Sequence, residues 1–156
     1  MKIRPAKQTD RPQILEVHTS AIRELCAQHY TAAEIAAWSG RPQEGSYERV
    51  IRERKFLVAA DADVVVGFGQ LDVVTGEVEA IYVRPSAARS GVGSRLLSEL
   101  ENVARDLSLG ELFLDSSLNA VPFYERAGFR STERRVHRVD AAVEIACVRM
   151  LKNLIP

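Results

Sequence analysis

The sequence is poor in cysteine and has no long apolar run. Its two cysteines, Cys26 and Cys147, lie in no CxxC or Cys/His pattern, so neither a zinc site nor a thiol redox motif is indicated. The first residues, MKIRPAKQTD, lack the apolar core of a secretion signal, and no later stretch approaches the length of a membrane span. We therefore expect a cytoplasmic protein without a membrane partner, whose two thiols stay reduced and pack as small apolar groups.

The chain also lacks a net charge. Lys and Arg together number 21, as do Asp and Glu, which leaves no overall basic surface for nucleic acid. With 156 residues, 46% of them hydrophobic and 27% charged, the chain has the composition of an ordinary globular protein. We expect a single domain over residues 1–156.

The periodicity of the apolar residues switches between two and about 3.6, which indicates both strands and helices. Strands are expected over residues 2–6, 56–60, 64–74, 77–83, 111–115, 129–139 and 141–151. Helices are expected over residues 11–25, 31–40, 92–107 and 119–127. The helix starts have polar residues that favour caps: Asp10, Thr31 with Glu34 as a capping box, and Asn119, while Gly128 favours a left-handed end.

The order of these elements predicts the fold class. The strand at 79–83, the following helix and the strand at 111–115 form a crossover unit, which makes the two strands parallel. Hairpins join the other strands. We therefore expect an α/β fold, with a mixed and mostly antiparallel sheet of about seven strands, one parallel pair and about four flanking helices.

A glycine-containing turn, Ala88 to Ser94, joins a strand to the longest helix. Glycine lets a backbone approach a ligand closely, and the first N–H groups of a helix are unpaired and carry partial positive charge. Such a turn suits a pyrophosphate. It does not match a Walker A loop, because Ser94-Arg95 follows its last glycine, or a Rossmann fingerprint, because Leu96 stands where a third glycine is needed.

Taken with its neighbours, this turn resembles the GNAT superfamily of acyl-CoA-dependent N-acetyltransferases. Gly76–Pro85, the turn and Asn119–Phe129 carry the resemblance, in that order, and it covers residues 56–130. It implies the GNAT fold, whose parallel strands splay apart. It also implies an enzyme that moves an acetyl group from acetyl-CoA to a primary amine by direct attack in a ternary complex, without a metal. A homodimer is the assembly that the resemblance favours.

The resemblance also implies which residues bind coenzyme A. Backbone N–H groups of the turn would hold the pyrophosphate, and the open strand edge would pair with the pantetheine amides. The implied cofactor residues are Ile81, Tyr82, Val83, Arg89, Ser90, Gly91, Val92, Gly93, Ser94, Asn119 and Tyr124. The turn departs from the family's pattern at Ala88, where Gln or Arg is usual. That departure removes one side-chain contact and leaves the main-chain contacts intact.

Two carboxylates, Glu77 and Glu79, alternate with Ile81 and Val83, which predicts that all four share one face of the strand. An alkyl amine is mostly protonated at neutral pH, so a base must free it for attack, and we assign Glu79 first and Glu77 second. A solvated strand end with two ordinary glutamates is the alternative. The resemblance makes Tyr124 the acid that protonates the leaving thiolate, and the alternative is a core tyrosine.

The acceptor site would lie under the first two helices and the last hairpin. His18, Tyr30 and Trp38 are the candidate substrate-binding residues there, with Arg23 and His29 as further residues to inspect. A surface or core role is the simpler interpretation of each. A non-catalytic acyl-CoA-binding module is the alternative function, because it needs the turn but neither Glu79 nor Tyr124.

Overall fold

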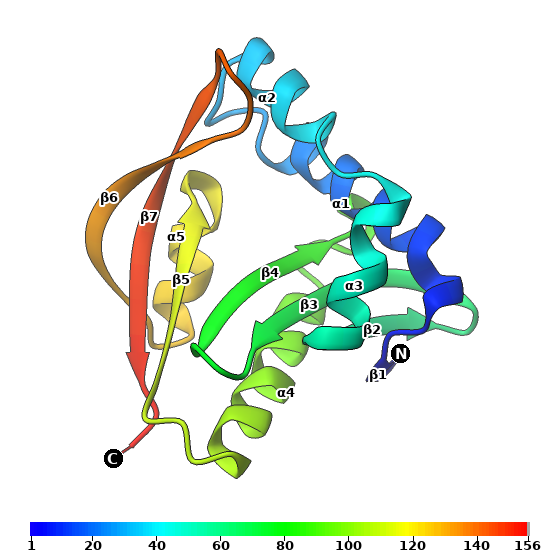
Figure 1. Ribbon diagram of the computed structural model, residues 1–156, viewed down its shortest axis with the longest axis vertical. Coiled ribbons are helices and arrows are strands. Elements are labelled where there is room, and N and C mark those ends of the chain that lie inside the picture. Colours follow the sequence, from blue (N-terminus) through cyan, green and yellow to red (C-terminus); the bar gives the residue numbers. More distant parts are fainter. Residues whose placement is uncertain (156) are drawn as a thin grey trace.

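The computed structural model describes residues 1–155, which form a seven-stranded sheet with helices on both faces (Figure 1). The strands are β1 (Lys2–Pro5), β2 (Lys55–Asp61), β3 (Val64–Asp72), β4 (Glu77–Val83), β5 (Glu111–Ser117), β6 (Arg130–Arg138) and β7 (Glu144–Asn153). The helices are α1 (Arg11–Leu25), α2 (Ala32–Ser39), α3 (Tyr47–Glu53), α4 (Val92–Asp106) and α5 (Val121–Arg126). The strand order β1-β2-β3-β4-β5-β7-β6 confirms the mixed sheet with one parallel pair.

That parallel pair, β4 and β5, joins the two halves of the sheet at one point. The register has a single pair of partners, Glu77 and Phe113, next to a hydrogen bond from the Phe113 N–H to the Gly76 carbonyl. Beyond it the two strands diverge, as Figure 1 shows. The edge of β4 that faces β5 is therefore open from the middle of the strand to its end.

A β-bulge interrupts β4 beside this divergence. Gln70 of β3 pairs with Ala80, whereas the next residue, Leu71, pairs with Val78, so Glu79 has no partner in the register. The extra residue shifts the alternation of side chains. Val78 therefore joins the same apolar core as Ile81, three positions later. The prediction that Glu77, Glu79, Ile81 and Val83 share one face is wrong for this reason.

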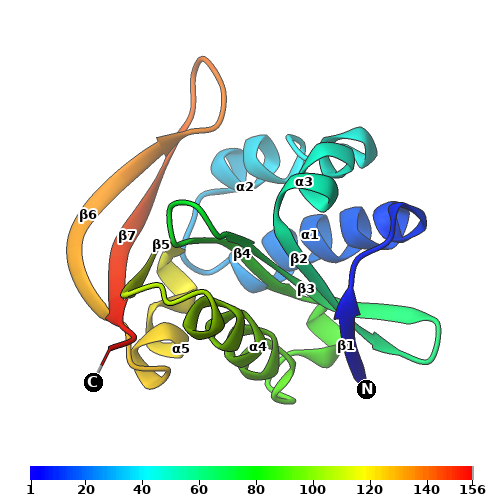
Figure 2. The same cartoon turned by 60° about the horizontal axis from the view of Figure 1, so that its bottom comes forward.

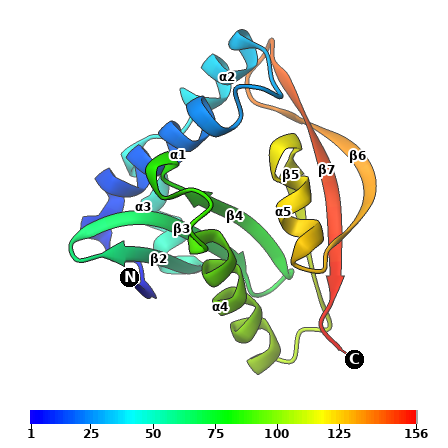
Figure 3. The same cartoon turned by 180° about the vertical axis from the view of Figure 1, so that it is seen from behind.

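Two large apolar cores hold the sheet, and a smaller cluster of Cys26, Tyr30 and Ile145 lies beside β7. One lies between the sheet and helices α4 and α5 and includes Leu71, Leu96, Leu100, Leu112 and Met150. The other lies on the opposite face of β2–β4, where Ile14 and Val17 of α1 and Tyr47 of α3 contact Val58 and Phe68. Figure 2 shows α1–α3 on one side of these strands and α4 on the other, and Figure 3 shows α4 and α5 from behind.

Most predicted elements are confirmed, with two local differences. β3 ends at Asp72 rather than at 74, because the Asp72 carboxylate accepts hydrogen bonds from the Val74 and Thr75 N–H groups at 2.9 and 3.4 Å. Helix α3 was not predicted, since no side chain caps it and its place comes from packing. None of the helices over residues 1–155 has the length and apolarity to cross a membrane.

Of the predicted helix ends, those at Thr31 and Gly128 are confirmed and the cap at Asp10 is not. The capping box is confirmed, with Thr31 accepting from the Glu34 N–H at 3.1 Å and Glu34 accepting from the Thr31 N–H at 2.8 Å. Asp10 does not cap α1, because its carboxylate binds the Arg4 guanidinium at 2.8 and 3.0 Å and the Lys7 N–H. Gly128 has the predicted left-handed conformation, with φ +96.

Candidate active site

A cavity of about 520 Å³ opens where β4 and β5 diverge. Side chains from α1, α2, α3 and from strands β3 to β7 line it, so both halves of the sheet contribute. Such a cavity is the usual place for a small-molecule site in a mixed α/β fold. The predicted residues His18, Tyr30, Trp38, Glu77 and Glu79 all border it, as does Tyr124.

The turn before α4 forms a row of free backbone donors. Among residues 1–155, no acceptor is found for the N–H groups of residues 89–94, and the first helical bond runs from the Arg95 N–H to the Gly91 carbonyl. Arg89 and Gly91 have positive φ values of 62 and 87, and backbone in which such residues alternate with others is typical of anion-binding turns. Together with the partial positive charge at the start of α4, this arrangement can bind an anion through main-chain contacts.

The two glycines of the turn have different structural tasks. A Cβ atom on Gly91 would meet nothing within 4 Å, so this position needs glycine for its backbone conformation. A Cβ on Gly93 would lie 3.2 Å from the Phe123 ring and 3.6 Å from Val83. Gly93 therefore lets α4 lie close to α5, a packing role that the sequence pattern did not distinguish from ligand binding.

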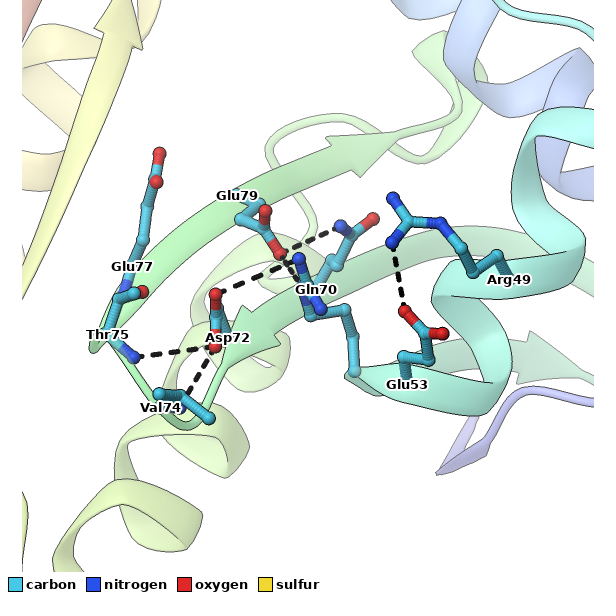
Figure 4. Close-up of polar contacts among 9 residues, drawn as sticks. Arg49, Glu53, Gln70, Asp72, Val74, Thr75, Glu77 and Glu79 are labelled. Atoms are coloured by element: carbon cyan, nitrogen blue, oxygen red, sulfur yellow. Dashed lines mark hydrogen bonds and ion pairs between the residues drawn. The ribbon is translucent and has the colours of Figure 1, made fainter.

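Glu79 is held by its neighbours. Its Oε1 accepts hydrogen bonds from Arg54 Nε at 2.7 Å and from Gln70 Nε2 at 3.0 Å, and Figure 4 shows it turned toward Gln70. Arg54 also lies 3.8 Å from Asp72. Oε1 of Glu79 is therefore occupied by a charge-assisted hydrogen bond and a second hydrogen bond.

Glu77 has the opposite environment. Among residues 1–155 its carboxylate has neither a salt bridge nor a hydrogen-bond donor, and it projects from the start of β4 on the side of β5 (Figure 4). Burial raises the pKa of Glu77, and the charges of Glu79 and Asp115 raise it further. A carboxylate with a raised pKa is a better proton acceptor than an ion-paired one.

Tyr124, on α5, is both packed and available. Only 6% of the residue is exposed, and its ring lies edge-on to Phe123 and Phe129. No hydrogen bond of its hydroxyl is found among residues 1–155, and the residue borders the cavity. Burial raises the pKa of Tyr124 well above its ordinary value, so the hydroxyl keeps its proton at neutral pH.

Asn119 precedes α5 but does not cap it. The N-cap position is Ala120, and the helix start has no side-chain cap. The Asn119 Oδ1 is buried and has no partner among residues 1–155. Its side chain lies beside the Cys26 thiol, whose pKa burial raises to about 11. A buried oxygen without a donor is costly, which fits an atom that a ligand completes.

The residues predicted to bind the acceptor substrate differ in the contacts that their side chains already make. His18 Nδ1 lies 2.8 Å from the Tyr47 hydroxyl, and its ring centre lies 4.3 Å from that of Tyr82. The Tyr30 hydroxyl donates to the Ala146 carbonyl at 2.6 Å and accepts from the Leu118 N–H, so it ties β7 to the start of α5. Trp38 packs edge-on against Tyr30. Arg23 and His29 border other surface recesses and not this cavity.

The comparison with protein families fits this geometry. The family model described as an acetyltransferase (GNAT) domain matches residues 26–151. The chain belongs to the GNAT acetyltransferase family. It is 27% identical over 135 residues to the uncharacterized N-acetyltransferase YafP of Escherichia coli K12, covering 86% of this chain and 85% of that protein.

Solved GNAT structures share the fold. A GCN5-related N-acetyltransferase from Rhodopseudomonas palustris superposes with a TM-score of 0.90 at 24% identity, covering 97% of this chain and 94% of that one. The PaiA N-acetyltransferase from Thermoplasma acidophilum, in complex with coenzyme A, has a TM-score of 0.79 at 21% identity, covering 97% and 98%.

One cluster in this GNAT domain was missed from the sequence. Asp115 of β5, His137 of β6 and Cys147 of β7 border the cavity, with ligand-capable atoms within 4.8 Å of one another. Arg149 donates to both oxygens of Asp115, at 2.6 and 3.1 Å, and Arg135 lies 3.7 Å away. These guanidinium groups oppose a metal cation at this place. The three residues lie on three different strands and span 32 positions of the sequence, from 115 to 147, so no local motif identifies them.

Proposed function

We propose that this GNAT domain transfers an acetyl group from acetyl-CoA to a primary amine by direct attack, with both substrates bound. The observation that carries the proposal is that an unpaired carboxylate, Glu77, and an unpartnered hydroxyl, Tyr124, border the same cavity at the splayed strands. The reaction needs one group that accepts a proton from the amine and one that gives a proton to the thiolate.

Coenzyme A would lie along the open edge of β4. Within residues 1–155, the N–H groups of residues 89–94 have no acceptor and are available for its pyrophosphate, and residues 81–83 have no strand partner on the side of β5. The pantetheine amides can pair with this edge as an added strand does. Asn119 Oδ1, buried without a donor, would receive a hydrogen bond from the bound cofactor.

The contacts of the two carboxylates favour Glu77 over Glu79 as the base, the opposite of the order that we assigned from the sequence. The Glu79 carboxylate is bound by Arg54 and Gln70. The Glu77 carboxylate has no such contact among residues 1–155, is half-buried and has a raised pKa. We therefore assign Glu77 as the group that binds the ammonium and takes its proton. The amine attacks the thioester carbonyl, the carbon–sulfur bond breaks, and Tyr124 gives its proton to the thiolate sulfur.

The test measures thiol release from acetyl-CoA with a panel of small amines, amino acids and peptides. Replacing Tyr124→Phe is expected to lower kcat by about tenfold to 100-fold while acetyl-CoA affinity is nearly unchanged. An unchanged kcat in this variant would remove Tyr124 as the acid. Tight acetyl-CoA binding without thiol release for any acceptor would instead favour a non-catalytic acyl-CoA-binding module.

A further inference from the structure

The cluster that the sequence did not reveal contains a histidine held by a carboxylate. His137 Nε2 lies 2.8 Å from Asp115 Oδ2, and Asp115 is itself fixed by two hydrogen bonds from Arg149. Burial alone would raise the pKa of Asp115, but the bonds from Arg149 and His137 outweigh it and lower the pKa. Asp115 is therefore a charged acceptor at neutral pH, fixed on β5 and directed at the imidazole.

This contact decides which ring nitrogen of His137 can accept a proton. A carboxylate only accepts hydrogen bonds, so the nitrogen that faces it, Nε2, must carry a hydrogen. In the neutral ring the lone pair is then on Nδ1, which has no partner among residues 1–155. The side chain is 52% exposed and borders the same cavity as Glu77 and Tyr124. It can therefore exchange protons with water.

The chemistry of the proposed reaction needs a second proton acceptor. An alkylammonium ion, R–NH3⁺, loses two protons on its way to the amide R–NH–CO–CH3. The thiolate receives one of them in effect, because Tyr124 protonates the sulfur and the proton taken by Glu77 then returns to Tyr124 through solvent, and the other must be released to solvent. After Glu77 has taken the first proton and the amine has attacked, the tetrahedral adduct carries a positive nitrogen with two protons, one of which must leave before collapse to the amide.

We propose that His137, oriented by Asp115, takes this second proton through Nδ1 and passes it to water. The inference rests on the proposed acetyl transfer. Imidazole suits the task because one ring nitrogen can hold the bond to Asp115 while the other accepts the proton. Asp115 is a positioning residue, since it acts on the reaction only through the ring. The charged and titratable groups that face His137 are Glu77 of β4, Asp115 of β5, Arg135 of β6, and Cys147 and Arg149 of β7.

The test uses the full chain and an amine that the wild-type protein acetylates. His137→Ala is expected to lower kcat by about tenfold to 100-fold, without a change in acetyl-CoA affinity, and imidazole added to the buffer is expected to restore part of it. Rescue by a free base is informative, because a merely structural role of His137 would not respond to it. His29→Ala, in a recess away from the cavity, is the matched control and should keep wild-type kcat.

The variant Asp115→Asn tests whether Asp115 acts by orienting the His137 ring or only by stabilising the fold. The amide can donate as well as accept, so the ring is no longer held in one tautomer, and the pH dependence of kcat should change while the KM for acetyl-CoA does not. Denaturant unfolding of this variant shows whether the loss of the Arg149 contact also lowers the stability of the fold.

Two outcomes separate the inference from the function on which it rests. If the wild-type protein is active and His137→Ala keeps its kcat and its pH profile, His137 is not a proton acceptor and the proposed function stands. If acetyl-CoA binds and no amine releases thiol, the proposed function fails and the inference fails with it.

Discussion

The two halves of the sheet are built differently. Strands β2–β4 are covered on both faces, by α1 and α3 on one side and by α4 on the other, and Val58 and Phe68 are almost fully buried. On the face of β5–β7 toward α4 and α5, Leu112 and Met150 are fully buried. The opposite face has a small apolar cluster, in which Ile145 packs with Cys26 and Tyr30, beside its charged groups. All nine residues of the outermost strand, β6, are exposed.

The open face of β5–β7 has a charged network where the other half has a second apolar core. Asp115, Arg149, Arg135 and His137 lie there, linked by contacts of 2.6 to 3.7 Å. The two halves of the sheet therefore have different roles. The doubly covered half fixes the position of β4 and of the turn before α4, and the half with an open face brings polar groups to the cavity. The site lies at the junction, where a single pair of residues joins the strands.

The largest expected effect concerns the two glutamates at this junction. We expect Glu77→Gln to lower kcat/KM at least about 100-fold, because it removes the only lining carboxylate without a bound donor among residues 1–155. Glu79→Gln should lower it less than about tenfold, since that carboxylate is already paired with Arg54. Steady-state kinetics of both variants with one amine measures the difference.

The two variants are matched, because each replaces a carboxylate by an amide of the same size on the same strand. Equal losses would mean that the Arg54 contact does not withdraw Glu79 from the chemistry. A larger loss for Glu79→Gln would return the assignment to the one made from the sequence.

The second prediction compares the packing of the two halves with one residue type. Val58→Ala, at a site with 0% exposure in β2, should lower the free energy of unfolding by about 2–3 kcal/mol. Val136→Ala, at a site that is 63% exposed in β6, should change it by less than about 0.5 kcal/mol. Denaturant unfolding measures both. A loss of 1 kcal/mol or more at Val136 would mean that something covers β6 in solution.

Local patterns were enough to predict most of the fold. The alternation in β2–β4, the apolar stripe of α4 and the crossover to β5 are periodic signals, and the capping box at Thr31 is a signal of fixed spacing. The bulge at Glu79 has no such signal. It follows from the pairing of β3 with β4, and it changed which side chains share a face.

The candidate site was predicted where it depends on one segment and missed where it depends on several. Glu77, Tyr124 and the turn before α4 were found on contiguous motifs. The ion pair of Glu79 with Arg54 joins residues 25 positions apart, and the hydrogen bond between Asp115 and His137 joins residues 22 positions apart. Such contacts depend on the register of distant strands, which one sequence does not specify.

The third and smallest effect tests whether the doubly covered half tolerates charge. His18 lies among the rings of Tyr47, Phe68 and Tyr82, and burial lowers its pKa to about 4. The unfolded chain, with an ordinary imidazole pKa near 6.5, then binds more protons than the folded one between these two values. Stability is therefore full above about pH 6.5 and falls as the pH drops toward 4.

Between pH 7 and pH 5 this difference amounts to about 2 kcal/mol of unfolding free energy. His18→Phe should remove most of that loss, because a phenyl ring takes up no proton, whereas His29→Phe, at an exposed position, should leave it unchanged. Urea unfolding at the two pH values measures all three proteins. At pH 5 the paired carboxylates Asp10 and Asp115, whose pKa values are lowered, remain charged. The raised pKa of Glu77 acts in the opposite sense, equally in all three proteins, so the difference between the proteins reports on His18. An equal change in stability between pH 7 and pH 5 for the wild-type protein and His18→Phe would mean that His18 takes up its proton in the folded protein, and that the doubly covered half accepts charge as readily as the open face does.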